Sequence, residues 1–245
     1  MASAKCKNLL QDTSGAVMVE FTAAATVFLL LLFGSVEFAN LFYQWNAATK
    51  AVQWGARVAA VSDPVASNLK TLIGTEDGTT PGVVSTANYD CTCGWDQATT
   101  TMKCSGSVPT GAIACTYDAA ALQTLVFGRG ANGAVYQTCQ TSPANIGMCN
   151  LFPGLALENV TVEYKYTRLG YAGRPGSGGN TGGPVPTITV SLHQRVIAVD
   201  PNVLKFQFVL IGGLMKIGNT AFTGSIDMPS FATTVTGEDL AKAGS

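Results

Sequence analysis

The chain has 245 residues, enough for one large domain or two small ones. Its formal net charge is −1 and 12% of its residues are charged, roughly half the usual share. Because it has no cluster of lysines and arginines to displace counterions from phosphates, this composition excludes nucleic-acid binding. The apolar share of 47% comes in part from one stretch near the N-terminus.

That stretch covers residues 17–36 and has the sequence VMVEFTAAATVFLLLLFGSV. At a rise of about 1.5 Å per residue, some 20 apolar residues span the roughly 30 Å core of a bilayer. Lys5 and Lys7 precede it, so the positive-inside rule places the short N-terminal flank in the cytoplasm and the rest outside. We therefore expect a single-pass protein of a bacterial inner membrane with a periplasmic C-terminal domain.

The helical pattern continues past the apolar stretch without a break. Apolar or small residues recur at alternating spacings of three and four, at Phe38, Leu41, Trp45, Ala48 and Val52. A secretory signal peptide would have a shorter apolar core followed by a small-residue cleavage site. Asp63-Pro64 ends the pattern because proline disfavours helix at the residue before it. The sequence therefore predicts one helix over residues 16–61, with its first half in lipid.

Glu20 is the only ionisable residue of the apolar stretch. An unpaired carboxylate at that depth costs at least a few kcal/mol, so it has either a functional partner or a snorkelling position near the interface. The segment from Gly15 to Phe21 places Glu20 fifth after the glycine and resembles the processing motif of type IV prepilins. The resemblance implies that a prepilin peptidase cuts between Gly15 and Ala16. It also implies that Glu20 faces the new N-terminal amine of a neighbouring subunit.

Further segments narrow the resemblance to one family. Gly34 to Phe38, the run Leu41-Phe42-Tyr43 and the segment from Trp54 to Ala60 make residues 14–61 similar to the TadE-type domain. TadE-like proteins are minor pilins or pseudopilins of tight-adherence (Flp, type IVc) pilus systems. The resemblance implies a structural role in pilus assembly, adhesion and biofilm formation. It implies as partners other pilins or pseudopilins, the pilus assembly platform, the prepilin peptidase and the inner membrane.

Four residues of the predicted helix are candidates for helix packing: Glu37, Trp45, Gly55 and Arg57. Glu37 would lie near the outer lipid boundary, where a hydrated interfacial carboxylate is the simplest interpretation. Arg57 follows 20 positions later, about 30 Å away along a straight helix, so the two residues cannot pair within one chain. We expect Arg57 to dock the helix onto the following domain; an ion pair between staggered neighbours is the alternative.

Six of the seven cysteines lie close together in the sequence, at Cys91, Cys93, Cys104, Cys115, Cys139 and Cys149. An even set in an exported domain predicts disulfides. A metal site would need short-spaced pairs of thiolates, and only Cys91 and Cys93 come close to that spacing. Because a direct bridge between such near neighbours is strained, we expect each of these two to bond elsewhere. Six cysteines allow 15 pairings in all, and the sequence does not choose the partners.

The rest of the chain reads as an antiparallel β domain. Residues 121–127 form a short strand-like run. Residues 160–167 alternate apolar and polar side chains, and with a second strand over 188–196 they predict a hairpin around the glycine-rich stretch 170–183. The apolar run 206–215 is too short to span a bilayer, so it forms part of the core or, alternatively, lies on the outer leaflet.

Catalytic signals are weak. His193 is the sole histidine, which rules out a two-histidine metal site. Residues 128–133 match the pattern G-x-G-x-x-G, but no helical pattern follows, as a dinucleotide-binding fingerprint requires. We expect no enzymatic activity, no cofactor and no metal.

These observations predict an α+β protein with a pilin-like arrangement. The expected parts are a cleaved leader 1–15, a transmembrane and packing helix 16–61 and an extracytoplasmic domain 62–245. Within that domain lie a cysteine-rich segment 91–149 and a β-hairpin region 158–200. The leading hypothesis is a structural minor pilin or pseudopilin; the rival is a membrane-anchored envelope binding protein whose helix is only an anchor.

Overall fold

A computed structural model describes most of the chain. The described residues are 14–71, 80–84, 89–96, 98–108, 113–170, 174–175, 181–182, 185–192, 204–208 and 225–237. They fall into two compact units, one within 1–43 and 205–226 and the other within 44–204 and 227–245. His193, most of the apolar run 206–215 and the C-terminal tail lie outside the described residues.

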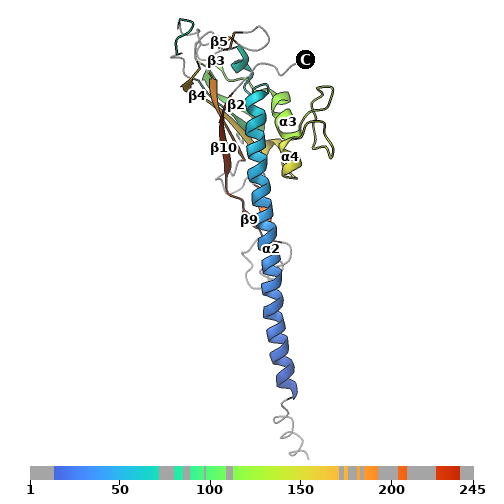
Figure 1. Cartoon of the computed structure of the whole chain (residues 1–245). Coiled ribbons are helices and arrows are strands. Elements are labelled where there is room, and N and C mark those ends of the chain that lie inside the picture. The colour runs from blue at the N-terminus through green and yellow to red at the C-terminus, as the bar shows by residue number, and fades with distance from the viewer. Residues whose placement is uncertain are drawn as a thin grey trace, which may run out of the picture. The chain divides into compact units, whose positions relative to one another are not determined.

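The long helix α2 spans Ser14–Val61, two residues earlier at its start than predicted. It is 48 residues long and contributes to both units (Figure 1). The Ser62 amide still donates to the Val58 carbonyl at 2.9 Å, and the chain then leaves the helix at Asp63-Pro64, as the proline predicts.

The first unit contains, besides the start of α2, a small two-stranded sheet of β8 (Lys205–Gln207) and β9 (Ser225–Asp227). Phe206 is buried and packs edge-to-face on Phe208, with ring centroids 5.0 Å apart. Phe206 is the first residue of the apolar run 206–215, so the start of that run is part of a core; residues 209–215 are not described.

The second unit is built on a six-stranded sheet in which every paired strand is antiparallel, in the order β10-β7-β4-β1-β2-β3. Its strands are β1 (Asp90–Asp96), β2 (Thr101–Val108), β3 (Ile113–Ala114), β4 (Val160–Leu169), β7 (Val185–Leu192) and β10 (Phe231–Thr236). The short strands β5 (Arg174–Pro175) and β6 (Thr181–Gly182) pair separately. The α+β class predicted from the sequence is confirmed.

The predicted hairpin is confirmed as the antiparallel pair β4–β7, with Val162 opposite Val190 and Tyr164 opposite Ile188. These four side chains are fully buried, while the intervening residues on both strands are polar and more exposed. The outer face is joined by hydroxyl groups, such as those of Thr189 and Thr234 at 2.9 Å. One face of the sheet therefore supplies the core.

The run 121–127 is a helix, and its prediction as a strand was wrong. Helix α3 spans Ala119–Phe127 and is followed by the short helix α4 (Met148–Leu151). Asp118 caps α3 by accepting hydrogen bonds from the amides of Ala120 and Ala121, at 3.0 and 3.1 Å. Gly128 ends the helix with a φ of +85°, a conformation open to glycine. Two 3₁₀ turns, η1 (Ser67–Thr71) and η2 (Leu157–Asn159), complete the unit.

All six clustered cysteines form disulfides, as predicted, in the pairs Cys91–Cys115, Cys93–Cys104 and Cys139–Cys149. Cys91 and Cys93 each bond to a different partner, which confirms the expectation that they do not bridge directly. Cys93 and Cys104 lie directly opposite one another on β1 and β2, with Cα atoms 4.0 Å apart. The sheet register therefore selects this pairing.

Candidate assembly helix and its attachment to the sheet

The first half of α2 exposes a long apolar surface. Large apolar side chains are uncovered throughout its first turns, including Val17, Met18, Phe21, Phe28 and Leu31. Among the described residues, α2 is the one helix long and apolar enough to cross a membrane, and none of its most apolar 18-residue window is buried. A surface of this kind is stable in lipid or against other helices. It is consistent with a single-pass membrane anchor.

Three hydroxyl side chains of this half bond to their own helix. Thr22 Oγ1 donates to the Val19 carbonyl at 2.9 Å, and Thr26 Oγ1 donates to the Thr22 carbonyl at 2.7 Å. Ser35 does the same with Leu32 at 2.8 Å. These bonds satisfy hydroxyl groups that could not reach water inside a bilayer.

The predicted processing and assembly residues lie on the first turns of α2. Gly15, Ala16, Glu20 and Phe21 are all exposed. A methyl group added at Gly15 would meet no atom within 4 Å, so nothing in the described structure crowds the bond after it. In the described part of the chain, no lysine or arginine lies within ion-pair distance of Glu20.

Glu37 differs from the expectation of a hydrated carboxylate at the lipid boundary. Its exposed fraction is 3%, which makes it the one buried acidic residue among the described parts of the chain. Because of this low exposure, Glu37 belongs to the interior of the first unit rather than to its surface. Burial of a carboxylate is costly unless polar groups surround it. Sequence periodicity could not reveal this, because Val36 and Phe38 beside it are exposed.

The second half of α2 packs through small residues. Its buried face is lined by Ala47, Ala48, Ala51, Val52, Gly55, Ala56, Ala59 and Ala60. Gly55 meets α4: a Cβ added there would lie 2.5 Å from the Met148 sulfur, so the helices touch at this point. Trp54 Nε1 also donates to the Ile146 carbonyl at 3.0 Å. Trp45 is 44% exposed and contacts β10, with its ring edge-to-face on Phe231 at 5.3 Å.

Arg57 lies on the side of α2 that faces β10, and its predicted docking role stays a prediction. Its side chain is exposed, and it lines a groove together with Ala60, Val61, Val235 and Thr236. The neighbouring Ala56 and Ala59 make the buried contact. Close packing of small side chains therefore contributes to the attachment of α2 to the rest of the second unit.

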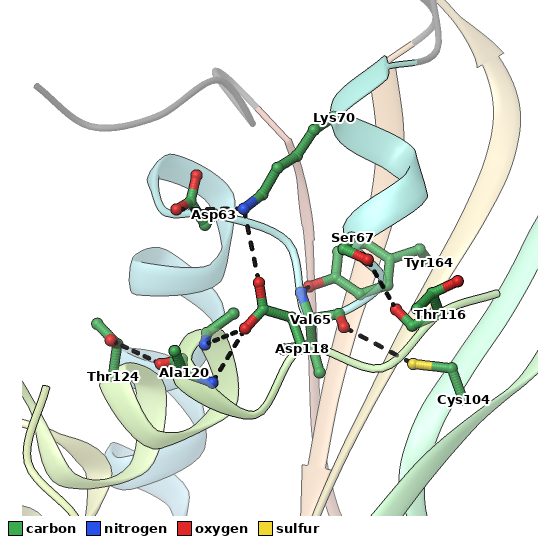
Figure 2. A network of polar contacts seen from close by, with 11 residues as sticks. Asp63, Val65, Ser67, Lys70, Cys104, Thr116, Asp118, Ala120, Thr124 and Tyr164 are labelled. Carbon is green, nitrogen blue, oxygen red and sulfur yellow. Dashed lines mark hydrogen bonds and ion pairs between the residues drawn. The ribbon is translucent and has the colours of Figure 1, made fainter.

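A polar network fixes the end of α2 to the rest of the second unit (Figure 2). Lys70 Nζ lies 3.3 Å from Asp63 and 3.6 Å from Asp118, so one ammonium links the second residue after α2 to the cap of α3. The Asp118 amide in turn donates to the Val65 carbonyl at 2.8 Å. Asp118 thus serves the α3 cap and the ion pair at once.

Tyr164 supplies the buried part of the same network. Its hydroxyl oxygen accepts a hydrogen bond from the Val65 amide at 2.9 Å, across 99 positions of sequence. The side chain is fully buried, and this burial raises the pKa of the Tyr164 hydroxyl well above its ordinary range. The tyrosine therefore stays neutral and holds the chain directly after α2 against strand β4.

The described residues show no grouping suited to metal chemistry. No set of three or more histidine, cysteine, aspartate or glutamate side chains among them could hold a metal ion. The glycine pattern at 128–133 begins at the end of α3 and no helix starts after it before α4, so it lacks the context of a dinucleotide site.

The fold thus defines an α+β protein with one long N-terminal helix, apolar and exposed in its first half, and a domain built on an antiparallel sheet with three disulfides. A family model described as TadE-like protein matches residues 15–57. The match begins at the predicted processing glycine and covers the exposed half of α2 and most of its buried half. It agrees with the resemblance to TadE-like proteins drawn from the sequence. No curated protein and no solved structure matches the chain.

Proposed function

We propose that the chain is a structural minor pilin or pseudopilin of a tight-adherence pilus, with a part in pilus assembly and through it in adhesion and biofilm formation. Its helix is inserted in the inner membrane with the N-terminus in the cytoplasm and the domain 62–245 outside. A prepilin peptidase removes residues 1–15. The observation that supports this most directly is Glu20, an exposed carboxylate in an otherwise apolar surface, five positions after the glycine at which the family match begins.

The proposed role of Glu20 follows from electrostatics. Cleavage after Gly15 would create a charged amine at Ala16, one helical turn before Glu20. In lipid or in a fibre both charges are costly alone, and each offsets the other's desolvation when they meet. A neighbouring helix shifted by about 6 Å along the axis, the rise of four residues, would bring its amine opposite Glu20. The pair would then set the stagger between subunits.

The processing claim is tested by mass spectrometry of the mature N-terminus in cells that contain the peptidase. A chain beginning at Ala16 is expected. A chain beginning at Met1 or Ala2 would refute processing, and a start elsewhere would refute the assigned site.

The role of Glu20 is tested separately from cleavage. Glu20→Gln keeps the size and removes the charge, so it should be cleaved and inserted normally but should impair piliation. Thr22→Val is the matched control, since Thr22 bonds only to its own helix among the described residues. Wild-type piliation in the Glu20→Gln strain would remove the proposed role.

A helix exchange distinguishes assembly from simple anchoring. Replacing residues 16–36 with an unrelated spanning helix keeps the anchor and removes the assembly surface. The proposal predicts loss of piliation in this variant, whereas a membrane-anchored binding protein would keep its function.

A further inference from the structure

Among the residues that the structure describes, strand β10 is an edge of the large sheet. It pairs with β7 on one side and is the end strand of the sheet within the described residues. Proteins usually protect an exposed edge with charged side chains or proline. The sequence of β10, FATTVT, contains neither. A six-residue edge of this kind is able to accept one further strand.

The register identifies the backbone groups that face outward. The Gly237 amide donates to the Pro186 carbonyl at 2.8 Å, so these two residues occupy a hydrogen-bonded position of the ladder, although proline has no amide to return the bond. In an antiparallel ladder such pairs alternate with residues whose amide and carbonyl point the other way. Counting back along the unbroken register, Ala232, Thr234 and Thr236 direct their backbone groups away from β7. All three are exposed.

A groove adjoins the C-terminal end of this edge. It has a volume of about 390 Å³ and lies between the last turns of α2 and β10, lined by Arg57, Ala60, Val61, Val235 and Thr236. Arg57 is its only charged lining residue, and no carboxylate among the described residues lies within ion-pair distance of the guanidinium. The groove therefore combines apolar walls with one positive charge.

We propose that β10 and this groove bind an extended, acidic segment of a neighbouring pilus subunit, which adds to the sheet as a seventh strand. Backbone groups of Ala232, Thr234 and Thr236 pair with the segment, and a carboxylate of the segment beside the C-terminal residues of β10 meets Arg57. The identity of the neighbour as a pilus subunit rests on the proposed function. The unpaired edge of β10 and the positive charge of Arg57 in the groove do not depend on it. If the segment runs antiparallel to β10, its acidic residue comes near the start of the segment.

Site-specific photocrosslinking of the full chain in piliated cells tests the occupant. The probe is p-benzoylphenylalanine at Ala232, which faces the edge but does not line the groove. The expected product joins Ala232 to an extended segment of another subunit that carries an aspartate or glutamate, identified by mass spectrometry of the crosslinked peptides. Crosslinks only to residues 238–245 of the same chain, only to a second copy, or to nothing would overturn the proposal.

Matched substitutions test the chemistry. Thr234→Pro removes one outward amide and leaves the ladder to β7 intact, while Thr234→Val keeps that amide and removes only the hydroxyl that bonds Thr189. Thr234→Pro and Arg57→Glu should each lower the crosslink yield about tenfold, the effect of losing one strong contact. Thr234→Val should lower it much less. Equal yields in all three variants would refute the edge.

Two controls keep the outcome interpretable. Thermal midpoints and disulfide content show whether each variant folds. If Thr234→Pro does not fold, Ala232→Pro takes its place and the crosslinking probe is moved to position 234. Piliation is scored in the same strains. If Glu20→Gln impairs piliation while Thr234→Pro behaves as Thr234→Val, the edge inference has failed and the pilus role stands. If Glu20→Gln is also wild type, the assembly role proposed for Glu20 has failed.

Discussion

Close packing of α2 against α4 makes Gly55 the most informative position for stability. In Gly55→Ala the new methyl group would lie 2.5 Å from Met148 Sδ, 3.0 Å from Cγ and 3.1 Å from Cε. Met148 is fully buried, so it can move only by displacing core atoms. Overpacking of this kind costs about 1–3 kcal/mol, while alanine gains about 1 kcal/mol over glycine inside a helix. We expect a net loss of about 1 kcal/mol.

A double-mutant cycle isolates the contact. Met148→Ala alone should cost about 2–5 kcal/mol by leaving a cavity. In the double variant the new methyl group at position 55 points into that cavity, so the combined loss should be smaller than the sum by about 1–2 kcal/mol. The measurement is denaturant unfolding of the full chain in detergent with disulfides intact, followed by near-UV circular dichroism. Gly34→Ala, where no atom lies within 4 Å, is the control and should not lower stability. Additive losses in the cycle would refute the contact.

Three further predictions concern the second unit. Tyr164→Phe should lower the free energy of unfolding by about 1–3 kcal/mol, since it leaves a buried amide without its acceptor; an unchanged denaturation midpoint would contradict this. Asp118→Ala should lower the free energy of unfolding by about 1 kcal/mol, because α3 loses its cap. Lys70→Met should lower it less, because the ion pairs of Lys70 are partly exposed to solvent. Equal losses in the same assay would argue against the cap. A hydrogen bond from Lys103 holds the pKa of Asp96 below its ordinary 3.8, so this group adds stability above that pH and loses it as the pH falls toward the folded-state pKa. Asp96→Asn should flatten the acid side of a stability–pH curve, and an unaltered curve would exclude the contribution.

The parts of the fold that could be predicted are those written in local patterns. The apolar stretch, the proline after the helix and the alternation in β4 each fix an element without reference to distant residues. The run 121–127 failed because a short apolar run suits either a strand or a helix. Asp118 decides between them by capping the helix, and a cap aspartate just before an apolar run was the signal available in the sequence.

The parts that could not be predicted depend on register and on distant contacts. The Cys93–Cys104 pairing follows from the alignment of β1 with β2, which cysteine spacing alone does not determine. In the sequence, Tyr164 is one apolar position of an alternating strand. Its hydrogen bond to Val65 joins residues 99 positions apart, so no local pattern could predict it. Strand order places β10 at the edge of the sheet among the described residues, so no pattern within residues 231–236 could predict this position.

The two halves of α2 obey different physical demands, and this separates assembly from folding. Leu31 and its neighbours in the first half are uncovered, so their apolar surface gains stability only from lipid or from other subunits. Ala51, Gly55 and Ala59 in the second half are already covered by their own chain, so their small size is required for folding. Substitutions within 17–36 should therefore alter insertion and piliation at nearly constant domain stability. Enlarging side chains on the buried face of 47–60 should lower domain stability first and piliation only as a consequence. A family match that spans both halves is then explained by two constraints acting on one helix, of which only the first depends on neighbouring subunits.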